Sequence, residues 1–459
     1  MIRALSLVFC ATAMCVAVAV LPVSPNAHAA QKKKAAEEWK APALPGGKDV
    51  VTDTADALVR VPDGVKLKDG VTVAKAAPTI DFAYFPGQTY AGKPWSNWGE
   101  STFANGKYYT SVGDHLAPAG SAYVYEYDPE RKTFRQLLDL KKLLAMPEGH
   151  YAPGKIHTAL TVGKDGQIYF GTHRGSTTVT TDKYHYKGDW LVRVNPEGPT
   201  AEVVAHAPVA KHCIPTGFLD PERLIFYGGT APGEGKDDAT GVHFFAYDVA
   251  NKKVLCDVAD GPKRAMIFAR STGRVYYTTA SESGMVRFDP AKGGNPVPIE
   301  GAISGLRASS EETKAGTVYA VSTGQGGREP ALYAFDTKTE RVTELGSPLV
   351  GSVSYITALK ADATGRYLYY IPGAHGGADK EGSPVVQYDT KAKTKKVIAF
   401  LHPFYKEKYG VAPVGTYSYA LSPKGDTLFV TWNANRGGKA WDTCVLSAIH
   451  IPDSERVTD

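Results

Sequence analysis

The 459-residue chain has few cysteines, and their spacing suggests neither a metal site nor a disulfide framework. Of the five, Cys10 and Cys15 belong to the N-terminal leader described below, which leaves Cys213, Cys256 and Cys444. No CxxC or CxxCH pair is present, which argues against structural zinc and attached haem. An odd number leaves at least one free thiol, and Cys256 and Cys444 lie in predicted strands, where a buried apolar role is expected. Disulfides are therefore not expected to hold the fold.

Common catalytic and nucleotide-binding motifs are also missing. The chain has no GxSxG, no P-loop, no HExxH and no GxGxxG in a strand–helix context. Asp-rich calcium loops are absent, because Lys236-Asp237-Asp238 is too short to count. The formal charge is only +5, and no basic stripe interleaves with aromatic residues, so nucleic acid is not an expected partner. A mildly basic protein is nevertheless compatible with an anionic ligand.

Long apolar runs are confined to the start of the chain. Arg3, the apolar stretch from Leu5 to Leu21 and the Ala27-His28-Ala29 cleavage signal predict a secretory signal peptide over residues 1–29. No later segment has the roughly 18 apolar residues that a transmembrane helix requires. We therefore expect an exported protein, periplasmic or extracellular. Residues 30–80 are charged, contain Ala and Pro and lack alternation, which predicts a flexible lead-in before a single domain over residues 81–459.

What the sequence does contain is a unit repeated seven times, a tight turn followed by an aromatic-rich strand. The turns are Asn105-Gly106, Asp165-Gly166, Asp220-Pro221-Glu222, Thr272-Gly273, Ala315-Gly316, Thr364-Gly365 and Lys424-Gly425-Asp426. A second strand follows each of the first six and ends on Asp or Asn, at Asp128, Asn195, Asp248, Asp289, Asp336 and Asp389. A period of roughly 40–60 residues built from short strands is typical of a propeller blade. The repeat predicts an all-β fold, a seven-bladed β-propeller of four-stranded antiparallel blades.

The repeat has a physical explanation. Alternating apolar and aromatic residues suit strands that pack between neighbouring blades, and the glycines supply the positive φ of a short turn. An Asp or Asn at the end of a strand can accept hydrogen bonds from backbone amides two residues on and so turn the chain. The last blade lacks a full fourth strand, and a strand near 70–74 is predicted to complete it and close the ring. A monomer is expected.

Blade geometry predicts where a functional site lies. The first strand of each blade begins, and the second ends, on one face of the ring, and the long loops open there too, which marks the functional face. Glu100 is the only carboxylate that opens an inner strand, and Tyr355 also lies at this rim. The candidate ligand-binding residues are Trp98, His115, Arg174, Arg264, Arg307, His375, Trp432, Asn433 and Arg436.

The strongest local signal lies in blade two, in the segment IHTALTVGKDGQIYFGTHRGS. A hairpin centred on Asp165 pairs Leu160 with Phe170 and places His157 opposite His173. Directly opposed residues have Cβ atoms about 4.5–5.5 Å apart. Two imidazoles so close could share a metal, one could keep the other neutral, or both could simply bond loop backbone. A divalent metal is therefore one possible cofactor, with His115, His157, His173 and His375 as candidate ligands.

The GKIHTAL and DGQIYFGTHRG segments with the YDP and YDT strand ends resemble uncharacterised secreted bacterial seven-bladed propellers. In architecture the chain is also similar to propeller polysaccharide lyases of the oligogalacturonate and ulvan lyase type. That resemblance implies a face of His, Tyr and Arg that binds a uronic acid, neutralises its carboxylate and removes the C5 proton. The chain departs from those families in its histidine spacing, and it lacks the Gln-x-x-His-x-His metal motif of oligogalacturonate lyases.

Three hypotheses follow. The first is a lyase acting on an acidic polysaccharide, with Arg174, Arg264 or Arg307 on the carboxylate, His157 or His173 as base, and Tyr417 or Tyr184 as acid. The second is a non-catalytic propeller that binds a glycan or a protein partner through the same face. The third is a metal-dependent enzyme built on the histidines. The sequence does not separate these three.

Overall fold

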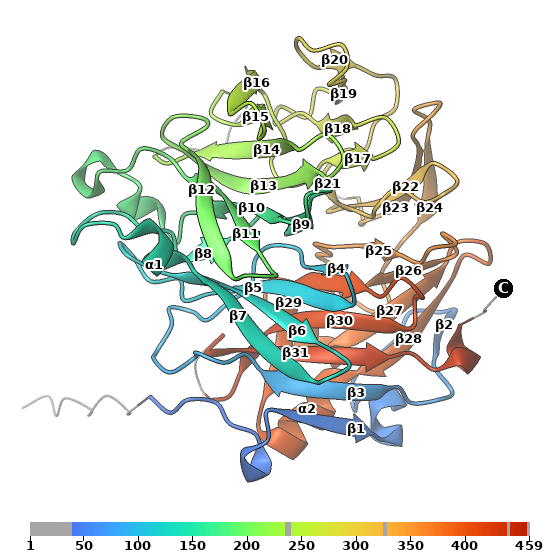
Figure 1. The fold of residues 1–459 in the computed structure, drawn as a ribbon. Coiled ribbons are helices and arrows are strands. Elements are labelled where there is room, and N and C mark those ends of the chain that lie inside the picture. The colour runs from blue at the N-terminus through green and yellow to red at the C-terminus, as the bar shows by residue number, and fades with distance from the viewer. Residues whose placement is uncertain (1–38, 235–239, 325–327, 438–440, 457–459) are drawn as a thin grey trace, which may run out of the picture. The chain divides into compact units, whose positions relative to one another are not determined.

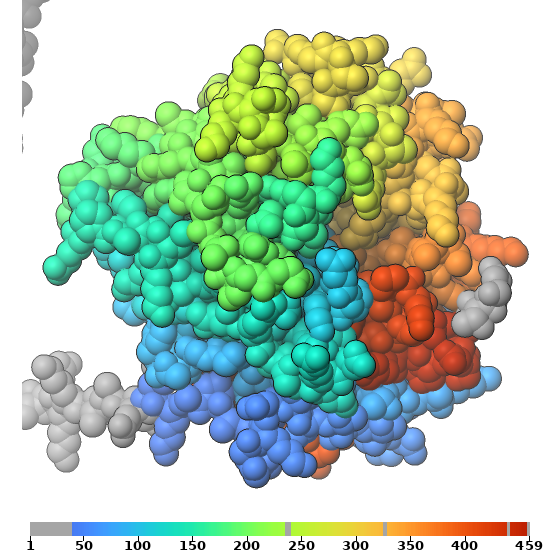
Figure 2. All heavy atoms as spheres, in the orientation of Figure 1, coloured from blue at the N-terminus to red at the C-terminus, as the bar shows by residue number. Residues whose placement is uncertain are grey.

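Seven sheets of four or five strands form the blades of a β-propeller in the computed structural model (Figure 1). The structure describes residues 39–234, 240–324, 328–437 and 441–456. The expected signal peptide and residues 30–38 lie outside this part. In the space-filling view the blades follow one another in chain order, from cyan through green, yellow and orange to red (Figure 2). The predicted fold class is confirmed.

Blades one to three are built from antiparallel strands that follow one another in chain order. Blade one consists of β4 (Thr102–Ala104), β5 (Lys107–Gly113), β6 (Ala122–Asp128) and β7 (Thr133–Asp139). Blade two has an interrupted innermost strand, β8 (Lys155–Ile156) and β9 (Thr161–Val162), then β10 (Ile168–His173), β11 (Trp190–Asn195) and β12 (Thr200–His206). Blade three consists of β13 (His212–Asp220), β14 (Ile225–Pro232), β15 (His243–Asp248) and β16 (Lys253–Ala259).

Blades four to seven continue the same antiparallel order. Blade four consists of β17 (Ile267–Ala269), β18 (Arg274–Thr278), β19 (Met285–Phe288) and β20 (Val297–Pro298), and blade five of β21 (Leu306–Ser309), β22 (Thr317–Ser322), β23 (Leu332–Asp336) and β24 (Val342–Gly346). Blade six contains β25 (Lys360–Ala361), β26 (Tyr367–Tyr370), β27 (Pro384–Asp389) and β28 (Thr394–Phe400). Blade seven contains β29 (Ala412–Leu421), β30 (Thr427–Asn435) and β31 (Thr443–His450).

The turn chemistry of the repeat is as the sequence predicts. Gly106 and Gly425, for example, have φ of 75° and 69°, the left-handed region that glycine adopts without steric cost. The Asp128 carboxylate accepts hydrogen bonds from the amides of Glu130 and Arg131, both at 3.0 Å. Equivalent bonds form at Asn195, Asp248, Asp289, Asp336 and Asp389. The first six blades thus turn into their fourth strands in the same way.

Closure of the ring differs from the expectation. The strand that completes blade seven is β3 (Thr79–Tyr84), which pairs antiparallel with β31. The predicted closing segment forms β2 (Val71–Val73), which instead pairs parallel with β28 at the edge of blade six. The Asp81 side chain of β3 accepts a hydrogen bond from Lys132 of the neighbouring blade, at 2.7 Å.

The expected flexible lead-in also contributes to the sheets. β1 (Val50–Thr54) pairs antiparallel with β3 as a fifth strand of blade seven, so ordered structure begins well before residue 81. The Asp53 carboxylate of β1 accepts hydrogen bonds from Lys408 and from the Tyr409 hydroxyl. Alternation of apolar and polar residues is weak in this segment, because its strand conformation is stabilised largely by pairing with β3. The composition of the segment does not reveal that partner strand.

Apolar and aromatic side chains fill the spaces between blades. Tyr108 and Phe429 stack with ring centroids 5.2 Å apart between blades one and seven, and Phe244 and Tyr277 stack at 5.0 Å between blades three and four. Burying one such side chain stabilises the fold by about 1.5–3 kcal/mol. Cys213, Cys256 and Cys444 are buried, which confirms the apolar role expected of the two strand cysteines, Cys256 and Cys444.

Helices are few and lie outside the sheets. The α-helices are α1 (Leu140–Leu144) and α2 (Leu401–Tyr409), and the short 3-10 helices are η1 (Pro45–Gly47), η2 (Asp56–Val59), η3 (Thr177–Val179), η4 (Asp182–Tyr184), η5 (Ala378–Glu381) and η6 (Asp453–Glu455). Within the described residues, none of the helices has the length and apolar character needed to cross a membrane.

Candidate functional site

Aromatic and cationic side chains gather around Trp98, at the end of the ring where the innermost strands begin. The Trp98 ring centroid lies 4.9 Å from that of Tyr417, 5.2 Å from Trp441, 5.6 Å from His375 and 5.8 Å from His157. We call this group the Trp98 cluster, made up of Trp98, His115, Lys155, His157, His173, Arg307, Tyr355, His375, Tyr417 and Trp441. Its members come from blades one, two, five, six and seven, on the face that the sequence predicts.

A network of buried polar groups holds Trp98 in place. The side-chain amide of Asn433 accepts a hydrogen bond from the Asn97 amide at 2.7 Å and donates one to the Asn97 carbonyl at 3.1 Å. The indole N–H of Trp98 donates to Ser96 Oγ at 2.6 Å. A Cβ at Gly99 would lie 2.3 Å from the Thr158 carbonyl oxygen, so the chain after Trp98 can only pass here without a side chain.

Register shifts in the pairing of two innermost strands redirect the side chains of two cluster residues. The pairing of β29 with β30 shifts register between Gly415 and Ser418, around Tyr417. The pairing of β21 with β22 shifts between Leu306 and Ala308, so Arg307 is the residue left between them. β-Bulges of this kind redirect side chains and are common beside functional sites. Both side chains are buried.

The histidine pair of blade two forms, but in a different register from the one expected. Next to the turn the hairpin pairs as predicted, with Tyr169 opposite Thr161. Beyond it the strand is interrupted, because Ala159 donates to the Gly217 carbonyl of blade three and Leu160 to the Glu100 carbonyl of blade one, both at 2.9 Å. His173 is consequently opposite Lys155, not His157. The two imidazole centroids still lie 4.8 Å apart.

Lys155 is one of two cluster residues that were not predicted from the sequence. Its side chain is buried, with a relative exposure of 8%, and its ammonium group lies 4.3 Å from the Trp98 ring centroid. In a strand, residues two apart face the same side, so its position two residues before His157 was an available signal. Trp441, which was also not predicted, follows the Gly437-Gly438 pair, and no strand alternation in the sequence points to it.

Arg307 and Tyr417 form the other side of the cluster. The Arg307 guanidinium carbon lies 5.2 Å from the Tyr355 ring centroid and 5.8 Å from that of Tyr417, within the range of cation–π attraction. Arg307 Nε donates to the Tyr355 hydroxyl at 3.3 Å. The Tyr417 hydroxyl and His375 Nδ1 are 2.6 Å apart. Tyr184, the other candidate acid, packs instead against the apolar cluster of blades one and two.

The electrostatics of the cluster favour neutral imidazoles. Burial, and then the charges of Lys155, Arg264 and Arg307, hold the pKa of His157 well below its usual value. Burial, Lys155 and His157 act in the same way on the pKa of His173, and burial lowers the pKa of His115 to about 4. Burial also lowers the pKa of Lys155 to about 7. Burial raises the pKa of Tyr417, so its hydroxyl keeps its proton at neutral pH.

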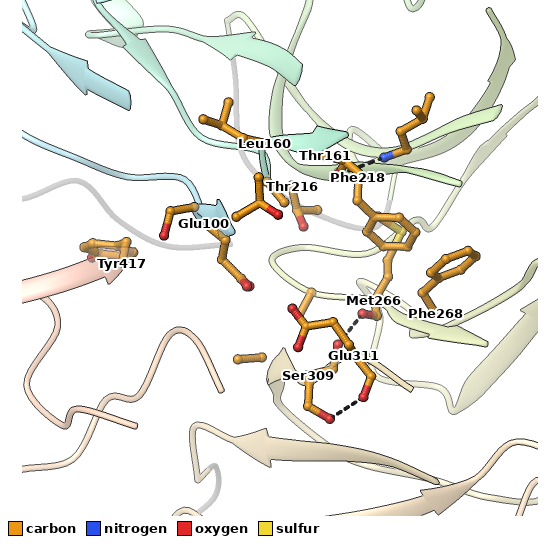
Figure 3. A pocket seen from close by; sticks show the side chains of 18 of the residues that line it. Glu100, Leu160, Thr161, Thr216, Phe218, Met266, Phe268, Ser309, Glu311 and Tyr417 are labelled. Atoms are coloured by element: carbon orange, nitrogen blue, oxygen red, sulfur yellow. Dashed lines mark hydrogen bonds between the residues drawn. The ribbon is translucent and has the colours of Figure 1, made fainter. Parts of the chain in front are cut away.

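A cavity of about 460 Å³ leads from the cluster into the ring. Phe218 and Phe268 lie together on one wall, with ring centroids 5.1 Å apart, and the side chains of Glu100 and Glu311 point into the cavity (Figure 3). Lys360 Nζ bridges the two carboxylates, at 2.9 Å from Glu100 and 2.8 Å from Glu311. Although burial alone would lower it, the pKa of Lys360 is raised by these carboxylates, so it stays charged.

Two further arginines lie close enough to influence the cluster. Arg264 lines the same cavity, and its guanidinium donates to the Lys263 carbonyl at 2.8 Å. Arg174 follows His173 and donates to the carbonyls of Pro232 and Gly233 in blade three. Both charges contribute to the lowered pKa of Lys155. Their expected place at the rim is therefore compatible with the structure.

Three other candidate ligand-binding residues do not belong to the cluster. Trp432 is fully buried in the core shared by blades six and seven, because the alternation of β30 turns it away from the channel. Asn433 is also fully buried and bonds the backbone of Asn97, so it positions Trp98. The Arg436 guanidinium carbon lies 4.9 Å from the centroid of the Trp39 ring, a residue that precedes the first strand.

The proposed histidine metal site does not assemble in the described residues. Within that part of the chain, no three side chains from His, Cys, Asp and Glu are placed to hold a metal ion together. His157 and His173 meet, whereas His115 and His375 each contact the Trp98 ring. The donor set that the four histidines were expected to form is therefore not found.

Comparison with known proteins supports the fold and goes no further. No protein-family model matches the chain, and no curated protein sequence matches it. Among solved structures it is similar to an oligogalacturonate lyase in complex with manganese, with a TM-score of 0.52 and 12% identity over 85% of this chain and 98% of that chain. An oligogalacturonate lyase from Vibrio parahaemolyticus gives a TM-score of 0.50 at 12% identity, with the same coverage of both chains. The architectural resemblance to propeller lyases is thus confirmed.

Proposed function

We propose that the Trp98 cluster binds an anionic ligand, an acidic polysaccharide or its oligomers, outside the cytoplasm. The observation that carries this proposal is the pair of buried cations. Lys155 and Arg307 are 8% and 6% exposed, and neither forms an ion pair within the described residues. Burying an uncompensated charge costs several kcal/mol. An anion bound between them would offset that cost through charge-assisted hydrogen bonds.

The aromatic members of the cluster suit a sugar. Trp98 and Trp441 are only partly buried, and their rings meet edge to face. Aromatic faces offer apolar area to a ring-shaped partner, and the polar tips of His375 and Tyr417 can satisfy hydroxyl groups. A combination of guanidinium, ammonium and aromatic groups therefore favours an acidic carbohydrate over a simple inorganic anion. The similar solved structures, described as oligogalacturonate lyases, agree with this ligand class.

The same residues fit cleavage by β-elimination. Arg307 would pair with the uronate carboxylate and make the C5 proton more acidic. A neutral imidazole of His157 or His173 would accept that proton, which their lowered pKa values permit at neutral pH. The C5–H electrons then form a double bond to C4, and the C4–O bond breaks. Tyr417, protonated because its pKa is raised, would donate a proton to the leaving oxygen.

The test is binding to a panel of pectic, alginate and sulfated uronate polymers, measured by affinity electrophoresis and calorimetry. Loss of Arg307 in an Arg307→Ala variant should weaken binding by about 10- to 100-fold, the value of one or two charge-assisted hydrogen bonds. The matched control is Arg193→Ala, which removes an arginine paired with Glu202 on the outer part of blade two. Ultraviolet absorbance of the same mixtures reports any unsaturated product.

Two outcomes would overturn the proposal. Failure of the wild-type protein to bind any acidic polymer would favour a protein partner for this face. Equal loss of binding in the Arg307 and Arg193 variants would show that general positive charge, not the cluster, attracts the polymer. Binding without new ultraviolet absorbance would leave the ligand class intact and remove the lyase chemistry.

A further inference from the structure

Lys155 has the surroundings of a reactive amine. It is more than nine-tenths buried, and it has no hydrogen-bond or ion-pair partner in the described part of the chain. Its cross-strand partner His173 is buried to the same extent, and His173 Nδ1 also has no hydrogen-bond partner there. A buried imidazole nitrogen without a hydrogen-bond partner, next to an amine that has no carboxylate partner in the described part of the chain, is costly unless a ligand completes the site. The Lys155 ammonium also lies against the Trp98 ring, and Trp98 lines the cavity.

The groups that face Lys155 are mostly cationic or neutral. They are the imidazoles of His115, His157 and His173, the guanidinium groups of Arg174 and Arg264, the Cys213 thiol and the Asp189 carboxyl. Asp189 is fully buried, accepts hydrogen bonds from Tyr151, Thr172 and Tyr186, and has its pKa raised by burial to about 6. Among the residues that the structure describes, no carboxylate bonds to the Lys155 ammonium, and burial lowers the pKa of Lys155 to about 7. A substantial fraction of the amine is therefore uncharged, and nucleophilic, at neutral pH.

We propose that Lys155 is a nucleophilic amine that forms a reversible imine with the aldehyde or ketone group of an anionic ligand held at the Trp98 cluster. The proposal rests on the proposed function for recognition of the anion. It adds a substrate class: acids with a free carbonyl group, such as the open-chain form of a uronic acid or a 2-oxo acid. Lys155 contacts the Trp98 ring and Arg307 contacts the Tyr417 ring, and these two rings pack against each other, so both cations belong to the same cluster.

The step balances without any further reactant. The lone pair of Lys155 Nζ attacks the carbonyl carbon, and the carbonyl π electrons move to oxygen, which takes up a proton. The resulting carbinolamine loses a proton from nitrogen and a hydroxyl from carbon, with help from a proton donor, so one water leaves and a C=N bond forms. The neutral imidazoles of His157 and His173 are placed to carry these protons. Hydrolysis reverses every step.

The experiment uses pyridoxal 5′-phosphate as an anionic aldehyde and pyridoxal as the same aldehyde without the phosphate. The full-length protein is incubated with each, borohydride reduces any imine to a stable secondary amine, and peptide mass mapping locates the label. We expect the phosphate compound to label Lys155 at least tenfold faster than exposed lysines at pH 7, with the rate levelling off above about pH 8. Lys155→Arg should remove this label, whereas Lys164→Arg, at an exposed site, should not.

The outcomes separate this inference from the proposed function. Equal fast labelling of Lys155 by both aldehydes would support the reactive amine and argue against anion recognition. Labelling by the phosphate compound that slows in Arg307→Ala, with pyridoxal unaffected, would support both. If neither aldehyde labels Lys155 ahead of exposed lysines in a protein that binds uronate polymers, the amine is not reactive and the inference is overturned while the proposed function stands.

Discussion

At the scale of single residues, Lys155 and Arg307 place positive charge where water has little access. Such groups are unfavourable for folding because desolvation is not offset by a paired carboxylate. Proteins often accept this kind of cost at a functional site, where activity and stability oppose one another. Backbone strain adds to this cost, because three neighbouring residues have positive φ: His115 at 51°, Tyr355 at 58° and Trp441 at 54°. Left-handed backbone is unfavourable for bulky side chains.

This leads to a prediction for Lys155→Met. Methionine keeps the length of the side chain and removes the charge, so the free energy of unfolding at pH 6 should rise by about 1–4 kcal/mol. Because the pKa of Lys155 falls to about 7 in the folded protein, the unfolded chain holds more protons between pH 7 and about 10.4. The free energy of unfolding of the wild-type protein therefore increases with pH across that window, as Lys155 becomes less unfavourable. The stability difference between Lys155→Met and the wild type shrinks accordingly.

Denaturant unfolding at pH 6 and pH 9 checks this prediction, with Lys164→Met as the control for loss of an exposed charge. The control should change stability by less than about 0.5 kcal/mol at either pH. A Lys155→Met variant that is less stable than wild type at pH 6 would mean that the ammonium is a stabilising group, which is contrary to the burial argument.

At the scale of elements, the repeat determines the blades and the irregularities determine the site. The Gly turns and the terminal Asp residues recur with the blade period, so the sequence alone predicts seven blades and their order. The interruption after His157 follows from hydrogen bonds to blades one and three, and the bulges at Arg307 and Tyr417 are breaks in strand pairing that the repeat does not reveal. The role of Asn433 could not be predicted from the sequence either. Residue alternation places Asn433 on a strand, but only the fold shows that its side chain holds the backbone of Asn97.

The closing strand gives a prediction at this scale. A chain beginning at residue 39 should unfold at the same temperature as the full chain, whereas one beginning at residue 85 lacks β3 and leaves the edge of β31 unpaired. A propeller whose seventh blade lacks its fourth strand and leaves the outer edge of β31 unpaired is expected to be unstable and prone to aggregate. Thermal unfolding and light scattering of the two proteins check this. Similar unfolding temperatures for both would contradict the role assigned to β3.

At the scale of the whole molecule, the ring presents charge of different sign at different depths. Lys155 and Arg307 lie in the Trp98 cluster and Arg264 nearby, whereas Glu100 and Glu311, which hold Lys360 between them, lie further along the innermost strands, and the Glu311 side chain is 69% exposed. An anion is therefore expected to bind at the Trp98 cluster and not beside Glu100 and Glu311. The fold itself does not choose among ligands, since propellers serve many functions. The ligand class rests on the cluster.

The most direct test of this account compares ligands that differ only in charge. Oligomers of galacturonate, mannuronate and guluronate, and the same oligomers with their carboxylates reduced to alcohols, are titrated into the protein in a calorimeter at low and moderate salt. The account predicts that at least one acidic oligomer binds at a single site, more weakly as salt increases, and that its reduced counterpart does not bind. Equal binding of an acidic oligomer and its reduced counterpart, or no binding by any of them, would contradict an anion-binding site at Trp98.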